Sequence, residues 1–99
     1  LACPSSSVQS LAGISELSNL EQLELSDNSI IDLSPLSSLR NLRILSIRNN
    51  RITDINALLP LPILRFVALQ GNNRLPCRQL EVLGDKIGNS LNRPASCIN

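Results

Sequence analysis

The stretch LEQLELSDN at residues 20–28 decides the fold, because it returns 22 residues later as LRILSIRNN at 42–50 and again as LRFVALQGN at 64–72. Each copy carries a branched apolar residue at its first, fourth and sixth places and an asparagine at its ninth. One period upstream, the places that follow the asparagine are again apolar: Val8, Leu11, Ile14 and Leu17. Chance does not align so many apolar positions, so the chain is built from copies of one unit.

Within each copy, apolar residues alternate with outward ones, as in Leu23-Glu24-Leu25, which is the period of a short strand. The asparagine that follows ends the strand. Its amide group has two donors and one acceptor oxygen, so in a buried turn it can satisfy backbone groups of its own coil and of the neighbouring coil. We therefore predict a structural ladder of stacked asparagines: Asn28, Asn50 and Asn72.

The second half of each unit predicts tight turns. Apolar residues stand three apart from Leu33 to Leu39, which fits 3₁₀ turns better than a full α-helix. Pro35 supports this, since its fixed φ and missing N–H suit the start of a turn. Asp32 and Asp54 share one place in neighbouring units, and we expect their carboxylates to cap turns rather than to form a catalytic pair or a calcium site.

These residues carry a family resemblance. The runs LxxLxLxxNxI at 20–30 and LxxLxIxxNxI at 42–52 match the leucine-rich repeat signature. The repeat length, with IDLSPL at 31–36 and TDINAL at 53–58 on the far side, resembles the internalin-like or SDS22-like subclass. The resemblance implies an α/β solenoid, a right-handed superhelix with short parallel strands on its concave face, 3₁₀ helices and turns on its convex face, and a C-terminal capping helix. We assign about three and a half units, the first incomplete, to residues 1–74 and the cap to residues 75–99.

The repeat pattern breaks at Arg74, where a different kind of segment begins. Residues 75–99 carry apolar side chains at helical spacing: Leu80, Leu83, Ile87 and Leu91. Pro76 suits the start of a helix, and Gly84 or Gly88 suits its end. Because a solenoid leaves the apolar edge of its last coil bare, we interpret this helix as a terminal cap.

The cysteines bear on the cap and on the compartment. Cys77 and Cys97 bracket the predicted helix, where proteins of this kind are often stapled, so we expect a disulfide there; two unrelated buried thiols are the alternative. Such a bond would close a loop of about 20 residues and contribute about 3 kcal/mol. Cys3 falls on the place of Leu25, which indicates a small buried thiol unless its partner lies in an upstream segment.

A disulfide implies an oxidising compartment, so we expect a secreted, cell-surface or periplasmic protein. The chain holds no Asn-x-Ser/Thr sequon, which favours a bacterial origin over a glycosylated eukaryotic one. It begins in the middle of a coil, which suggests a piece of a longer protein. We expect this fragment to be a monomer.

The composition argues against catalysis and against several kinds of ligand. No histidine occurs among the 99 residues, which removes the commonest general base and the commonest metal ligand. Nine basic and eight acidic residues give a net charge of +1, and no apolar run is long enough to span a bilayer, so neither a nucleic-acid partner nor membrane insertion is indicated. We expect no catalytic residues, no cofactor and no metal.

A solenoid binds partners along its concave sheet, where alternate strand side chains point outward. The repeat places Phe66, the only aromatic residue, beside Ile44 on this face, and aromatic residues dominate interface energetics. Packing of Phe66 under the cap is the alternative. Arg43 and Arg65 share a place near the strand entry, which suits either an acidic partner or simple solubilisation. We predict this partner-binding set: Gln22, Glu24, Ile44, Ser46, Arg48, Phe66 and Gln70.

Three functions follow. The first is a non-catalytic protein–protein interaction module of a larger extracytoplasmic leucine-rich repeat protein, which binds a protein partner through the concave sheet. The second is a purely structural role as the C-terminal coils and cap of a longer solenoid. The third is an intracellular SDS22-like regulatory subunit, which requires Cys77 and Cys97 to be reduced. Thiol titration separates the third function from the other two.

Overall fold

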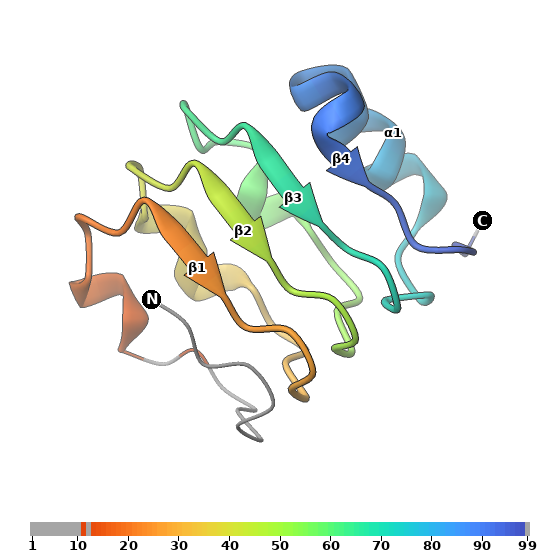
Figure 1. The fold of residues 1–99 in the computed structure, drawn as a ribbon, viewed down its shortest axis with the longest axis horizontal. Coiled ribbons are helices and arrows are strands. Elements are labelled where there is room, and N and C mark those ends of the chain that lie inside the picture. The colour runs from red at the N-terminus through yellow and green to blue at the C-terminus, as the bar shows by residue number, and fades with distance from the viewer. Residues whose placement is uncertain (1–10, 12, 99) are drawn as a thin grey trace.

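A computed structural model of the chain describes residue 11 and residues 13–98. Short strands alternate with 3₁₀ helices, which are labelled η here, until an α-helix interrupts the pattern (Figure 1). The elements follow one another along the chain as η1 (Ile14–Glu16), β1 (Gln22–Glu24), η2 (Ser34–Ser38), β2 (Ile44–Ser46), η3 (Asn56–Leu58), β3 (Phe66–Ala68), α1 (Cys77–Ile87), η4 (Gly88–Ser90) and β4 (Leu91–Asn92). The expectations for residues 1–10, including the core position of Cys3, lie outside the described residues.

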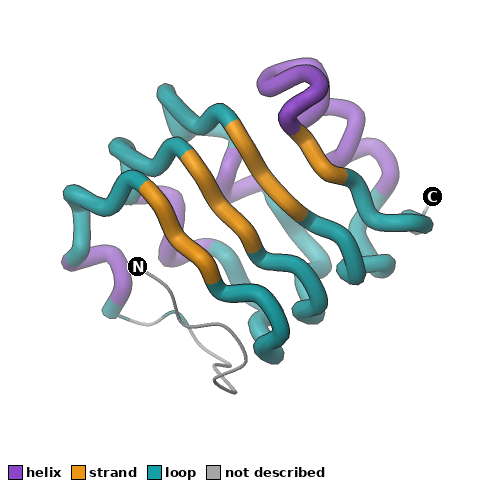
Figure 2. Tube along the Cα trace, viewed as in Figure 1, coloured by secondary structure: helices purple, strands orange, loops and turns teal. Residues whose placement is uncertain are grey.

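Within the described part of the chain the strands form one parallel sheet in the order β1-β2-β3-β4. The register follows the sequence repeat, since Leu23 pairs with Leu45 and Leu45 pairs with Val67. Figure 2 shows the helical segments behind this sheet, on the opposite wall of each coil. The predicted solenoid, with strands on one wall and 3₁₀ turns on the other, is confirmed.

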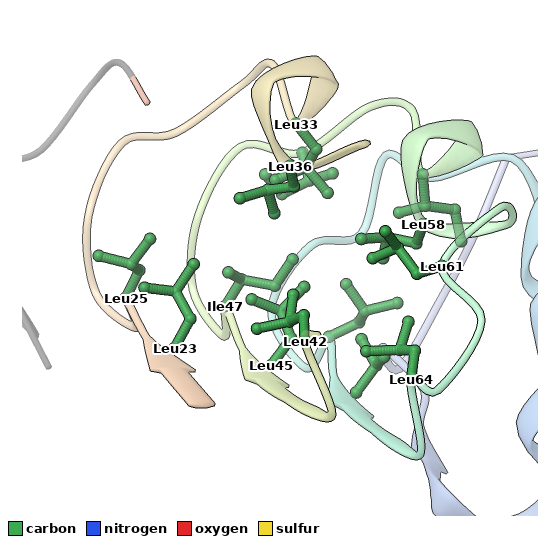
Figure 3. Close-up of a cluster of buried hydrophobic side chains, with 14 of the residues drawn as sticks. Leu23, Leu25, Leu33, Leu36, Leu42, Leu45, Ile47, Leu58, Leu61 and Leu64 are labelled. Atoms are coloured by element: carbon green, nitrogen blue, oxygen red, sulfur yellow. The ribbon is translucent and has the colours of Figure 1, made fainter. Parts of the chain in front are cut away.

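The core fills the space between the two walls. Leu23 and Leu25 project inward from the coil of β1, toward Leu33 and Leu36 on the turn side (Figure 3). From Leu23 to Leu69 the leucines and isoleucines at the repeated places are almost fully removed from water, with Leu36 and Leu45 at 0% exposure, whereas Leu17 in the first unit is 46% exposed. Burial of each such side chain contributes roughly 1.5–3 kcal/mol relative to exposure, so this column of aliphatic residues is the main source of stability.

The turns on the far wall are built as the sequence predicts. Pro35 stands in the first turn of η2, where its missing N–H costs no hydrogen bond. The carboxylate of Asp32 accepts a hydrogen bond from the backbone N–H of Ser34 at 2.9 Å, and that of Asp54 accepts one from Asn56 at 2.8 Å. These bonds confirm that the two aspartates cap turns, and the bonds from Ser34 hold the pKa of Asp32 below its ordinary value.

The repeated asparagines are buried and join adjacent coils. Asn50 donates hydrogen bonds to the carbonyl oxygens of Ile47 in its own coil and Leu25 in the preceding coil, both at 3.0 Å. Its Oδ1 accepts a bond from the backbone N–H of Ile30 at 3.0 Å. Asn72 repeats this arrangement one coil later, and Asn28 donates to Leu25 within its own coil at 2.8 Å. Each asparagine thus replaces backbone hydrogen bonds that the turning chain has lost.

The cap contains a helix and a strand. Pro76 precedes the first helical residue of α1, and Gly88, at φ 65°, ends the helix in a conformation that favours glycine. Leu80 and Leu83 are buried against the last coil. The prediction that Leu91 belongs to this helix was wrong: Leu91 begins β4 and pairs with Val67 of β3. The reason is that β3 would otherwise leave its backbone groups unpaired, and a strand after the helix satisfies them.

A disulfide joins the two ends of the cap. Cys77 and Cys97 are bonded, with their Cα atoms 5.1 Å apart. Backbone hydrogen bonds support the link, because the Cys77 N–H donates to Ile98 at 2.8 Å and the Ile98 N–H donates to Leu75 at 2.8 Å. The start of α1 and the segment after β4 are therefore held together by covalent and backbone bonds.

Candidate binding surface

The side of the sheet that faces away from the core, called the sheet face here, presents two rows of side chains across the strands. The strand register places Gln22, Ile44 and Phe66 side by side in the first row. Glu24, Ser46 and Ala68 form the second row, beside Asn92 of β4. The alternation along each strand turns the residues between these rows, such as Leu45, into the core.

The first row contains an apolar pair on an otherwise polar face. Ile44 is 39% exposed, and its paired neighbour Phe66 is half-buried. Directly paired residues on one face of a sheet lie about 5 Å apart, close enough for their side chains to touch. Phe66 is therefore neither fully outward nor sealed in the core. Ile44 and Phe66 are called the apolar pair below.

The second row is closed by small residues. Ser46 is buried at 9% exposure, and its hydroxyl group lies 3.0 Å from that of Ser26 in a hydrogen bond. The expectation that Ser46 points freely toward a partner therefore needs correction. Ser46 lies between Glu24, which is longer, and Ala68, and the adjoining strands are only about 4.8 Å away, so they cover its short side chain although it points away from the core. Ala68 is buried at 3% exposure for the same reason.

Glu24 is held in a fixed position at the edge of this row. Its Oε1 accepts a hydrogen bond from the backbone N–H of Ser26 at 2.8 Å. Burial acts to raise the pKa of Glu24, but hydrogen bonds from Ser26 and Ser46 and the positive charge of Arg48 outweigh it, and the pKa lies below its ordinary value. The carboxylate is thus ionised and preorganised, while Arg48 is exposed beside it.

Gln70, the last member of the predicted partner-binding set, is less available than the sequence suggests. It is half-buried, and its Oε1 is buried without a hydrogen-bond partner among the described residues. The neighbouring row is tight as well. Asn49 donates a hydrogen bond to Asp27 at 2.8 Å, and a Cβ atom on Gly71, which has φ +86°, would stand 3.0 Å from the Asn49 Cα. This end of the sheet face is closely packed.

The opposite end, where the chain enters each strand, is open. A groove of about 640 Å³ lies there, called the arginine groove below and lined by Asn19, Glu21, Asn41, Arg43, Ile63 and Arg65. The repeat places Arg43 and Arg65 at equivalent positions, but the groove itself was not predicted from the sequence. A signal was present, since Glu21 occupies the same place one period earlier.

No constellation that could hold a metal ion is found in residues 13–98, where no three His, Cys, Asp or Glu side chains come together. In the same part of the chain no helix has the length and apolar character needed to cross a bilayer. The sheet face and its edge present an apolar pair, a fixed carboxylate and exposed guanidinium groups.

Comparison with known proteins agrees with this architecture. A family model described as leucine-rich repeats in two copies matches residues 18–60. None of the curated proteins compared with the chain is significantly similar to it. An internalin (InlF) from Listeria monocytogenes superimposes with a TM-score of 0.66 at 25% sequence identity, over 93% of this chain and 34% of the internalin. Internalin C2 from the same organism gives a TM-score of 0.62 at 24% identity, over 98% of this chain and 51% of the internalin.

This chain therefore spans about a third of one internalin structure and half of the other. The repeated residues, the coil architecture and these matches agree: residues 18–60 match leucine-rich repeats, and the chain folds as a leucine-rich repeat solenoid similar to those of the internalins.

Proposed function

We propose that this chain is a non-catalytic protein-interaction module of a larger extracytoplasmic, bacterial leucine-rich repeat protein, and that it binds a protein partner through the sheet face. The observation that carries the proposal is the apolar pair. An exposed Ile44 beside the only aromatic residue of the chain forms an apolar centre on a surface that is otherwise polar. Apolar and aromatic anchors within a polar rim are the usual anatomy of a protein interface.

The residues around the apolar pair suit the rim of such an interface. Glu24 is ionised and held by Ser26, so a partner does not have to order it on binding. Arg48 is exposed and can form bidentate hydrogen bonds to carboxylates. Gln22 completes the rim on β1. Ser46 and Gln70 have supporting roles, because the first is buried and the second is half-buried.

The assignment to an extracytoplasmic compartment is supported by the bond between Cys77 and Cys97. Disulfides persist in oxidising compartments and are rare where glutathione and thioredoxin keep thiols reduced. A thiol titration of the denatured, unreduced chain tests this point. One reactive thiol, that of Cys3, is expected, whereas three reactive thiols would favour the intracellular SDS22-like alternative.

The binding proposal is tested by comparing captured proteins between matched variants. The immobilised chain is exposed to extracytoplasmic proteins of the source organism, and proteins bound by the wild type, Ile44→Ala, Phe66→Ala and Ser37→Ala are identified. Ser37 is exposed on η2, on the opposite wall, and serves as the control. A partner should be retained by Ser37→Ala and lost from both apolar-pair variants. Identical capture by all four proteins contradicts the proposal.

A structural role is the second candidate, and the half-burial of Phe66 favours it. In this reading Phe66 stabilises the last coils of a longer solenoid whose binding surface lies elsewhere. The free energy of unfolding of Phe66→Ala separates the two. A loss of stability as large as that of a core substitution, roughly 3–5 kcal/mol, supports the structural role, and a loss below about 1.5 kcal/mol supports binding.

A further inference from the structure

The arginine groove carries a more specific inference about the partner. Backbone hydrogen bonds hold its central row together, because the Arg43 N–H donates to Glu21 and the Arg65 N–H donates to Arg43, both at 2.8 Å. Three side chains therefore leave the backbone from equivalent places, one strand spacing of about 4.8 Å apart. The row contains one carboxylate followed by two guanidinium groups.

The ion pairing between side chains along this row is incomplete. Arg43 reaches back by one coil and forms an ion pair with Glu21, with its Nη1 3.3 Å from Oε1. Arg65 repeats the place of Arg43 but finds another arginine one coil back, and no described carboxylate pairs with it. Its side chain is exposed and lines the open groove. The guanidinium of Arg65 thus lacks the partner that its neighbour has.

We propose that the arginine groove binds a carboxylate side chain of an acidic segment of the protein partner, held between Arg65 and Arg43. The proposal rests on the function proposed above and adds the charge of the partner. The pair of Glu21 and Arg43 is the internal example, because it shows a carboxylate held across one coil spacing by the same kind of side chain. A carboxylate of the partner placed one coil beyond Glu21 would contact Arg65 with the geometry that Glu21 has with Arg43.

The groove lies at the chain entry to the strands that carry the apolar pair. Arg43 and Arg65 directly precede Ile44 and Phe66 along the chain, and Ile63, which is 40% exposed, lines the groove itself. An extended segment with acidic and apolar side chains next to one another therefore fits both surfaces. The acidic residue contacts the guanidinium groups, and the apolar residue contacts the apolar pair.

The charges favour a protein carboxylate over a nucleic acid. The net charge of the chain is +1, and the groove holds one acidic side chain and two basic ones, so the attraction is local. Nucleic-acid sites use a long basic stripe with aromatic side chains for stacking, and this chain has a single aromatic residue. Two guanidinium groups that lie one coil spacing apart can donate charge-assisted hydrogen bonds to one or both oxygens of a carboxylate.

The test is a titration of the ¹⁵N-labelled chain, followed by NMR, with two blocked peptides: acetyl-Leu-Glu-Leu-Glu-Leu-amide and its glutamine counterpart. We expect the glutamate peptide to shift the signals of Arg43, Arg65 and the apolar pair, and to bind about fivefold more tightly than the glutamine peptide, the scale of an exposed charged pair. Arg65→Ala should remove the difference between the peptides.

The outcomes separate this inference from the proposed function. Equal affinities for both peptides, with shifts at the apolar pair, overturn the carboxylate site and leave the function standing. Shifts confined to the arginines keep the carboxylate site and contradict the apolar centre. Absence of shifts with either peptide at millimolar concentration overturns both proposals. Tighter binding of a twelve-residue thymidine oligonucleotide at the same residues overturns the choice of a protein carboxylate.

A gain of affinity gives a second, independent measurement. Glu21→Gln removes the competitor that occupies Arg43, so the glutamate peptide should bind about two- to fivefold more tightly. Glu81→Gln is the matched control, since Glu81 is exposed on α1 and its substitution changes the net charge by the same amount. Equal gains in the two variants show an effect of net charge alone and overturn the proposal.

Discussion

Replacement of Asn50 by alanine tests the coil register directly, because one side chain serves two coils. Asn50 is 7% exposed and bonds the Ile30 N–H and the Leu25 carbonyl of the preceding coil, as well as Ile47 of its own. Alanine leaves the Ile30 N–H of the preceding coil without a partner, whereas the Leu25 carbonyl keeps its bond from Asn28 and the Ile47 carbonyl keeps its bond from Asn72. An unsatisfied buried group costs about 1–3 kcal/mol, so we expect a loss of stability in this range.

The measurement is urea unfolding followed by far-ultraviolet circular dichroism, since the chain has no tryptophan or tyrosine to report by fluorescence. A loss of this size is a substantial part of the roughly 5–15 kcal/mol that stabilises a domain, and lowers Tm by about 5–20 °C at this chain length. Asn73→Ala is the control, because Asn73 is exposed one residue after the ladder position Asn72. Equal midpoints for the two variants would refute the ladder and the coil register with it.

Further predictions concern the cap, a turn and pH. Reduction of the bond between Cys77 and Cys97 should lower stability by about 3 kcal/mol in thermal melts with and without reductant, and peptide mapping that finds Cys77 joined elsewhere contradicts this arrangement. Gly71→Ala should cost about 1–3 kcal/mol in urea unfolding, because its φ of +86° and the nearby Asn49 backbone both oppose a Cβ atom; an unchanged midpoint contradicts that packing. Because the folded pKa of Glu24 lies below the ordinary value of 4.5, its stabilisation is present above that pH and is lost as the pH falls through the folded pKa. Glu24→Gln should therefore flatten the dependence of unfolding free energy on pH below about 5, and a profile that stays as steep as that of the wild type shows that Glu24 is not the source.

The repeat made most of the fold predictable. Spacing alone put Leu23, Leu45 and Val67 at equivalent core places, and the structure pairs them in one sheet. The turn chemistry of Pro35 and Asp32 followed from local rules as well. These features depend on residues that are close in sequence or one fixed period apart, so a single sequence contains the information needed to predict them.

The cap and the surface were harder to predict because their geometry depends on distant neighbours. Leu91 continues the helical spacing, yet it lies in a strand, since Gly88 ends the helix and the edge of β3 accepts a new strand. Ser46 points outward by alternation but is buried by neighbouring strands. To predict the arginine groove, one must know how far side chains such as Ile63 project from the surface, and a repeat pattern does not give this.

The strand β4 has a consequence for how such a molecule can associate. Coils that are nearly alike could stack end to end between two molecules. The unpaired backbone groups at the edge of one sheet can pair with a coil of a second molecule as they would with another coil of their own chain. In this chain the C-terminal edge is a strand of only two residues, with α1 packed beside it (Figure 1). This edge offers fewer backbone groups for pairing than the three-residue strands before it, so the element that completes the sheet also disfavours pairing with a second molecule along this edge.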